Sequence, residues 1–324
     1  MRRREMARVC LAGGIAAAAA ALAGPAAAQN RVRRIGLLWA STGNERSRHE
    51  AIDHLQKVGA VEGRDYALLV RSAEGDKAKL PQLARELVAE GAEIILTTGD
   101  VAGTVLRATT AVPVVAMGVS DVGLAALAAE GHRGRVAAID MQVRPLSLKR
   151  LELLSSCLPR GARVLMVAES RHREGSTRPA MEQAAARLGI ELHPSWCDTA
   201  ADLPAVLTHA RRIKAVGLYQ HFGSVLFGLH PQLIALAGEA RLADMYEWPS
   251  AARRGGLMGY GAIQAELFRQ FYAQAWRILQ GASPASLPLE GPMQVQLALN
   301  MARAKSIGLR IPAALLARAD EVIA

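Results

Sequence analysis

Residues 93–102 read EIILTTGDVA and contain the pattern that decides the fold. An aliphatic strand over 93–97 leads through the polar turn Thr98-Gly99-Asp100 into a helix that is predicted to begin near Val101. Short aliphatic runs that alternate with segments of helical periodicity are typical of a parallel sheet with crossover helices. This stretch therefore predicts an α/β protein.

The same alternation extends on both sides of this unit. Apolar runs predict further strands at 34–39, 66–71, 114–117 and 135–140. Helices are predicted at about 45–58, after the N-cap Asp76, and from about 101, with a small helix before the last strand. Together these segments predict a first lobe that is built on one sheet.

A second alternation begins at Pro145, where a leucine-rich helix starts. Strands are predicted at 163–168, 190–196, 215–219 and 243–246, and helices near 177–188, 202–212 and 230–241. Because the pattern has restarted, these segments predict a second sheet and a second lobe.

The last quarter of the chain is predicted to return to both lobes. The glycine-rich stretch 255–261 precedes an amphipathic helix that ends at Gly281, and 292–324 holds one further strand and a short helical tail. A lone strand and helix cannot bury themselves, so we expect crossings between the lobes near 141, 255 and 290. Lobe 1 is then 29–141 with about 257–290, and lobe 2 is 142–256 with about 291–324.

Residues 1–28 have the layout of a secretory signal peptide. Four arginines at positions 2, 3, 4 and 8 precede an apolar run over 9–23, and Ala26-Ala27-Ala28 offers a cleavage site. A membrane anchor is the alternative, but the run is shorter than the roughly 20 residues that a bilayer needs. We expect cleavage near Ala28 and a soluble mature chain in the periplasm, and both the general secretory and the twin-arginine routes remain open.

The charge of the chain does not indicate a nucleic-acid partner. The net charge is +10, and it falls to about +7 once four arginines and one glutamate are removed with residues 1–28. The arginine doublets at 33–34, 211–212 and 253–254 are far apart and lack interleaved aromatic residues. A solvated basic surface is the preferred interpretation.

Two cysteines, Cys157 and Cys197, follow the predicted signal peptide. Cys157 closes a helix at one end of the second sheet, and Cys197 follows a strand that ends at the other. A strand of five or six residues spans about 17–20 Å, whereas a disulfide tolerates a Cα separation of about 7 Å. Two free thiols are predicted.

Segments along the whole mature chain resemble one family, the ABC-transport substrate-binding proteins that include tryptophan- and tyrosine-binding members. The resemblance lies in the order and spacing of RIGLL at 34–38, VEGR at 61–64, LARELV at 83–88, IILTTG at 94–99, KRLELL at 149–154, GGLMGYG at 255–261, IP at 311–312 and RADEVI at 318–323. It implies the type I periplasmic-binding fold, two Rossmann-like lobes joined by three hinge crossings. It also implies a small-molecule ligand, an ABC permease and its ATPase as partners, and no cofactor.

The sequence departs from this family at two predicted strand ends. GVSDVG at 118–123 lacks the proline of the family's Gly-Asp-Pro turn, and ESRH at 169–172 stands where many members have Asn-Pro. Both segments are predicted to face the cleft between the lobes, where open α/β sheets bind ligands. The ligand of better-known members is therefore not carried over.

Helix N-termini at the cleft supply the candidate ligand-binding residues of lobe 1. Backbone N–H groups and a positive dipole end suit a carboxylate there. The candidates are Ser41, Thr42, Thr98, Gly99, Asp100, Val101, Ser120 and Asp121. Asp100 and Asp121 are also explained as plain N-caps. An acidic side chain here suits a ligand amine, so an amino acid or similar zwitterion is the working hypothesis.

Strand ends of the second sheet supply the candidates of lobe 2, which are Glu169, Gln220, His221, Tyr246 and Glu247. Only 4% of the residues are aromatic, yet Tyr219, Tyr246 and Trp248 fall near one predicted edge. Such rings stack on a planar or cationic ligand. Core packing explains Tyr219 almost as well.

No catalytic or metal-binding motif stands out. The sequence lacks a Walker loop, a Gly-x-Ser-x-Gly elbow and a His-Glu-x-x-His helix, and its eight histidines fall singly. We therefore predict the substrate-binding component of an ABC importer that captures a small molecule, an amino acid or an aromatic metabolite, and is no enzyme. A ligand sensor for a membrane receptor is the alternative, and an exported enzyme is a remote one.

Overall fold

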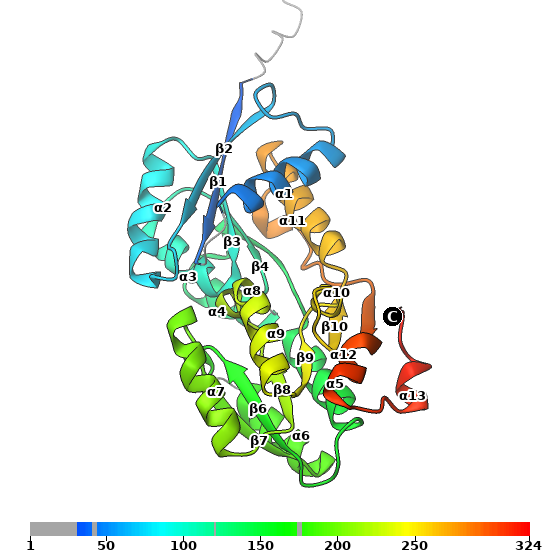
Figure 1. The fold of residues 1–324 in the computed structure, drawn as a ribbon. Helices are drawn as coiled ribbons and strands as arrows, with labels where there is room; N and C mark the ends of the chain where they lie inside the picture. The colour runs from blue at the N-terminus through cyan, green and yellow to red at the C-terminus, as the bar shows by residue number, and fades with distance from the viewer. Residues whose placement is uncertain (1–30, 41–43, 120, 174–176) are drawn as a thin grey trace, which may run out of the picture.

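The computed structural model describes residues 31–40, 44–119, 121–173 and 177–324 (Figure 1). The first sheet has the order β2-β1-β3-β4-β5, and its neighbours pair in parallel. Its strands are β1 (Arg33–Trp39), β2 (Tyr66–Ser72), β3 (Ile94–Thr98), β4 (Val114–Met117) and β5 (Val136–Ile139). The stretch 93–102 thus forms the central strand of this sheet and the start of the helix after it.

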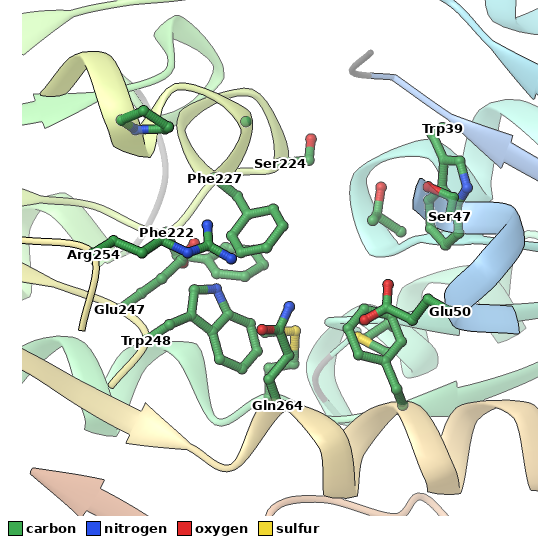
Figure 2. A pocket seen from close by; sticks show the side chains of 17 residues that line it. Trp39, Ser47, Glu50, Phe222, Ser224, Phe227, Glu247, Trp248, Arg254 and Gln264 are labelled. Carbon is green, nitrogen blue, oxygen red and sulfur yellow. The ribbon is translucent and has the colours of Figure 1, made fainter. Parts of the chain in front are cut away.

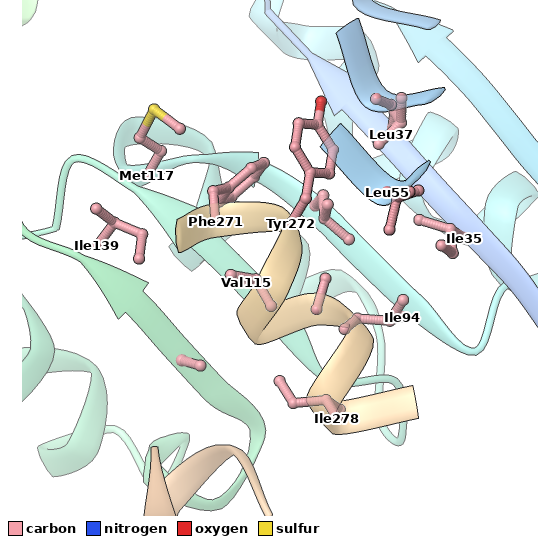
Figure 3. Close-up of a cluster of buried hydrophobic side chains, with 14 of the residues drawn as sticks. Ile35, Leu37, Leu55, Ile94, Val115, Met117, Ile139, Phe271, Tyr272 and Ile278 are labelled. Atoms are coloured by element: carbon pink, nitrogen blue, oxygen red, sulfur yellow. The ribbon is translucent and has the colours of Figure 1, made fainter. Parts of the chain in front are cut away.

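Helices cover both faces of the first sheet. They are α1 (Asn44–Lys57), α2 (Leu80–Ala89), α3 (Gly99–Ala108), α4 (Asp121–Ala129) and the returning α11 (Gln264–Leu279). Successive strand residues point to opposite faces, so Ile94 and Leu96 pack with α1 and α11, while Ile95 packs with α2 and α3. Figure 3 shows Phe271 and Tyr272 of α11 lying against the strands.

The second sheet has the order β12-β11-β10-β9-β8-β6-β7. Its strands are β6 (Arg163–Ala168), β7 (Glu191–Trp196), β8 (Gly217–Gln220), β9 (Ala243–Tyr246), β10 (Met258–Ala262), β11 (Val295–Asn300) and β12 (Glu321–Ile323). The pairs are parallel except β10 with β11. That pair is antiparallel because β11 enters the sheet from lobe 1 rather than from a crossover helix.

The longer helices of lobe 2 are α5 (Val143–Ser155), α6 (Thr177–Leu188), α7 (Leu203–Arg212) and α9 (His230–Glu239). The shorter ones are α8 (Ser224–Gly228), α10 (Ser250–Arg253), α12 (Met301–Ile307) and α13 (Ala313–Leu316). Helices α5 and α6 pack on one face of the sheet, and α7 and α9 pack on the other. The predicted two-lobed α/β fold is confirmed.

The described chain passes between the lobes after β5, after β10 and before β11. The first and third passages touch, because the Asp140 amide donates to the Glu290 carbonyl oxygen at 2.7 Å. The predicted return near 257 is corrected, since β10 extends the second sheet to Ala262 and the chain returns to lobe 1 with α11. We therefore propose 31–140 with 263–290 as lobe 1, and 143–262 with 295–324 as lobe 2.

The predicted signal peptide lies outside the described residues. Within the described ranges, no helix combines the length and apolar character needed to cross a membrane.

Cys157 and Cys197 are both free, as predicted. Cys197 is fully buried, and burial raises the pKa of its thiol to about 12. An alkylating reagent is therefore expected to modify Cys197 only after unfolding, because the thiolate is the nucleophile. Intact-mass analysis in denaturant without reductant is expected to show an addition at each of the two residues, and the absence of both additions would indicate a disulfide.

Candidate ligand site between the lobes

A cavity of about 310 Å³ lies between the lobes, at the carboxyl ends of both sheets. From lobe 1 it is lined by Trp39, Thr98 and Met117, the last residues of β1, β3 and β4. From lobe 2 it is lined by 222–224, which follow β8, and by 247–248, which follow β9. Open parallel sheets bind ligands at the carboxyl ends of their strands, because the loops that follow the strands surround that edge.

Aromatic side chains from both lobes line the cavity. Three of the four phenylalanines of the chain and two of its four tryptophans line it. Figure 2 shows Phe222, Phe227 and Trp248 on one side and Trp39 on the facing side. The rings of Phe227 and Trp248 meet edge to face, with their centroids 6.1 Å apart. In a chain with only 4% aromatic residues, five aromatic rings thus line one cavity.

A few polar groups interrupt this apolar wall. Glu50 on α1 and Gln264 at the start of α11 reach the cavity from lobe 1, and Ser224, Glu247 and Arg254 reach it from lobe 2 (Figure 2). An apolar pocket with a small number of placed polar groups is the usual form of a small-molecule site, in which the polar groups set orientation.

Glu247 is the most deeply buried of these polar groups, at 3% exposed. Its Oε2 has no hydrogen-bond partner among the residues that the structure describes. Its backbone is held by Gln220 Oε1, which accepts from the Glu247 amide at 3.4 Å, and by Arg150, which donates to the Glu247 carbonyl oxygen at 3.5 Å. Burial raises the pKa of the Glu247 carboxyl to about 8, against the opposing effect of the Arg150 charge.

Two glycines of β10 allow the backbone of residues 247–248 to lie directly against that strand. A Cβ on Gly261 would stand 2.1 Å from the carbonyl oxygen of Glu247, and one on Gly259 would stand 2.1 Å from that of Trp248. No side chain fits in that space, since β10 passes directly against this backbone. Gly259 and Gly261 therefore allow the backbone of Glu247 and Trp248 to lie directly against β10, in the position where both residues line the cavity.

Glu169 connects the loop after β8 with lobe 1, through a hydrogen bond on one side and an ion pair on the other. Its carboxylate is fully buried and accepts from the Val225 amide at 2.9 Å. It also forms ion pairs with Arg171 (2.9 Å) and with Lys77 (3.1 Å), which lies after β2 in lobe 1. The predicted residue is thus buried beside the site, where it connects the two lobes.

Gln220 and His221 lie in a buried polar network rather than on the cavity surface. Gln220 Nε2 donates to the His221 carbonyl oxygen at 2.7 Å, and its Oε1 lies 3.1 Å from His230 Nε2. The His221 ring meets that of His172 with centroids 4.6 Å apart. Burial lowers the pKa of His221 to about 3, so this ring is neutral.

Of the predicted site residues, Thr98 and Glu247 line the cavity. Three others do not line it. Val101 is buried in the core of lobe 1 and Tyr246 in that of lobe 2, while Gly99 packs at the turn against the carbonyl oxygen of Gly118. Ser41, Thr42 and Ser120, and the side chains of Asp100 and Asp121, lie outside what the structure describes.

Several lining residues were not among the predicted candidates. Trp39 ends β1 and Phe222 follows β8, so the rule that strand ends face the cleft applies to both, but they are missing from the predicted set. Phe227 on the short α8, and Gln264 and Phe268 on α11, reach the cavity from helices. The positions of these three side chains depend on how α8 and α11 pack in the tertiary structure. A local sequence pattern does not predict that packing.

Two parallel-sheet lobes that enclose one apolar cavity define the class of two-lobed ligand-binding proteins with the type I periplasmic-binding fold. Residues 42–323 match the family model described as ABC transporter substrate binding protein. The chain belongs to this family. A comparison with curated protein sequences gives no significant match.

Solved structures share the fold at low sequence identity. A conserved domain protein from Vibrio cholerae has a TM-score of 0.79 at 22% identity, covering 90% of this chain and 100% of that one. An ABC domain from Streptococcus pneumoniae in complex with L-Trp has a TM-score of 0.75 at 16% identity, with the same coverage. A solute-binding protein from Actinobacillus succinogenes with bound D-allose has a TM-score of 0.59 at 14% identity, covering 84% of this chain and 99% of that one.

Proposed function

We propose that this protein is the periplasmic substrate-binding component of an ABC importer and that it captures an aromatic small molecule between its lobes. The single observation that supports this most is the cavity at the carboxyl ends of both sheets, whose wall combines rings from both lobes. An ABC permease and its ATPase are the proposed partners, and residues 1–28 are the proposed export signal.

The ligand class follows from the composition of the wall. Trp39 faces Phe222, Phe227 and Trp248 across the cavity (Figure 2), an arrangement that suits a planar ring placed between them. Glu247 and Arg254 offer groups of opposite charge for the polar end of such a ligand. An aromatic amino acid or a related aromatic metabolite fits both features, and Thr98 and Glu247 are proposed contacts.

The proposed mechanism is capture by closure. Because the cavity takes its wall from both lobes, a ligand makes its full set of contacts only when the lobes are closed. Binding then shifts the population toward the closed form by the difference in affinity between the two forms. The chain would bend where it passes between the lobes, and the closed form would be the one that the permease recognises.

The first experiment screens aromatic amino acids and their metabolites by thermal shift and follows any hit by small-angle scattering. A ligand that binds only the folded state raises the melting temperature, because it adds about 2.7 kcal/mol of stability at a hundredfold excess over the Kd. We expect a shift with aromatic compounds, none with sugars, and a smaller radius of gyration at saturation. A radius that stays constant at saturation would refute closure, and a response confined to sugars would refute the ligand class.

Trp39→Ala is expected to weaken binding of the best aromatic hit at least tenfold, about 1.4 kcal/mol, because it removes the ring that faces lobe 2. Trp196→Ala is the matched control, since Trp196 stacks under Arg173 outside the cavity. Titration calorimetry gives both affinities, and melting curves check that both variants fold. Equal losses in the two variants would argue against a ligand ring beside Trp39.

A further inference from the structure

We propose that Glu247 selects the ligand by charge, binding a cationic nitrogen on an aromatic molecule and excluding aromatic molecules whose only charge is negative. This inference rests on the proposed function, because it assigns the polar end of the ligand in that cavity. It goes further by naming the residue that discriminates and the charge that it requires.

The first support is an unsatisfied group at the cavity wall. The Glu247 side chain is almost fully buried and lines the cavity, and its Oε2 has no hydrogen-bond partner within the described part of the chain. A buried carboxyl oxygen without a partner lowers stability. Because Glu247 is one of the residues that line the cavity, a donor group on a ligand is the partner that we propose for this oxygen.

Arg150 does not form a hydrogen bond with Glu247 Oε2. Its Nε donates to the Tyr260 carbonyl oxygen at 2.6 Å, and its Nη2 donates to the backbone carbonyl oxygen of Glu247 at 3.5 Å. These bonds join β10 to the segment after β9. The side chains of Gln220 and Trp248 hydrogen-bond to the Glu247 carboxyl group, and Oε2 is the carboxyl oxygen that has no partner among the described residues. Arg150 therefore supports the backbone, and its charge lowers the pKa of the Glu247 carboxyl against the larger effect of burial.

The other charged and titratable groups around Glu247 come from several elements. Glu50 on α1 and Arg254 after α10 line the same cavity, Glu169 after β6 adds a second negative charge behind the wall, and His221 after β8 is neutral. Among the described lining residues, two carboxyl groups thus stand against one guanidinium. The aromatic faces of Phe222 and Trp248 nearby also favour a cation over an anion.

A cation binds the ionised carboxylate, so Glu247 must release its proton when the ligand enters. Burial raises its pKa to about 8, and the group is mostly protonated at pH 7 in the free protein. The ligand ammonium keeps its own proton, the carboxyl proton leaves to solvent, and close to one proton is released for each ligand bound. A neutral or anionic ligand would cause no such release.

Three indole compounds that differ in charge test the proposal. They are tryptamine, a cation, L-tryptophan, a zwitterion, and indole-3-propionate, an anion. We expect the first two to bind about a hundredfold more tightly than the third, the scale of loss when a buried charge lacks its partner. Calorimetry in two buffers of different ionisation enthalpy is expected to show release of close to one proton with tryptamine at pH 7.

Glu247→Gln keeps the shape of the side chain and removes its charge. This variant is expected to bind tryptamine about a hundredfold more weakly and to release no proton, while its affinity for indole-3-propionate does not fall. Glu239→Gln is the control, because Glu239 pairs with Arg211 on the surface and its loss leaves all three affinities unchanged.

Stability against pH gives a readout that needs no ligand. The folded-state pKa of Glu247 is raised from 4.5, so its contribution to stability is fully present below pH 4.5 and is lost as the pH rises through about 8. Glu247→Gln has no such loss. Relative to wild type, its melting temperature is expected to rise between pH 5 and 9.

The outcomes separate this inference from the proposed function. If the indoles bind but wild type prefers indole-3-propionate, or if Glu247→Gln keeps both its preference for tryptamine and the proton release, the Glu247 proposal is overturned and the aromatic-ligand function stands. If none of the three indoles binds a folded protein whose Glu247 titrates as expected, the ligand class itself is overturned, and the charge selection with it.

Discussion

Gly261→Ala is expected to lower the free energy of unfolding by about 1–3 kcal/mol and to weaken ligand binding at least tenfold, because the new methyl group has no space. Its Cβ would lie 2.1 Å from the carbonyl oxygen of Glu247, and that atom belongs to the backbone. A flexible side chain could turn away from such a contact. Here the chain after β9 must shift, and it carries Glu247 and Trp248, which line the cavity.

Gly134→Ala is the matched control for this change. Gly134 lies in lobe 1, where an added Cβ would meet no atom of the described residues within 4 Å, and its φ does not favour glycine. Urea unfolding measures the two stabilities, and titration with L-tryptophan or the best aromatic hit measures the affinities. Equal unfolding midpoints for Gly261→Ala and wild type would show that β10 can move away from this backbone without cost.

Glu169→Ala is expected to reduce stability by about 2–3 kcal/mol and to open the lobes. The substitution leaves the buried Val225 amide without an acceptor and removes the ion pairs to Lys77 and Arg171. The expected loss is below that of a fully buried pair, because the side chains of Lys77 and Arg171 are 39% and 30% exposed. Urea unfolding and the radius of gyration of the ligand-free protein measure the two effects.

Lys77→Ala separates the two effects of Glu169. It removes the ion pair between the lobes and keeps the bond from the Val225 amide, so it is expected to cost less than about 1 kcal/mol. The ligand-free protein is nevertheless expected to have a larger radius of gyration than wild type. If Lys77→Ala scatters like wild type, the ion pair does not hold the lobes together, and the role of Glu169 is limited to the loop after β8.

The sequence pattern was informative about the two sheets because each depends on local periodicity. Continuous aliphatic runs such as 94–96 become strands covered on both faces. The order of runs and helices along the chain limits which strands can be neighbours in a parallel sheet. The assignment of 257–262 was wrong for a related reason. A glycine-rich segment resembles a linker, but β10 needs its glycines because neighbouring backbone lies against it.

The candidate site was predictable only as far as the rule for strand ends extends. That rule selected Thr98 and Glu247, which line the cavity. It also selected Tyr246, whose ring is buried in the core of lobe 2. Adjacent residues at a strand end point to opposite faces. Which of the two reaches the cavity depends on the register of β9 against β8 and β10, and the sequence does not state that register.

By itself, the sequence determined the α/β class, the restart of the pattern near Pro145 and the edge of each sheet where a ligand would bind, because these depend on periodicities of two and 3.6 residues along the chain. Only the tertiary structure decided that rings from β1, α8 and α11 meet around one cavity, that Glu247 is buried there with an oxygen unpaired among the described residues, and that Glu169 pairs with Lys77 in the other lobe. These are contacts between residues far apart in the chain. They exist only once helix packing and the return of α11 to lobe 1 have placed the two sheets against each other.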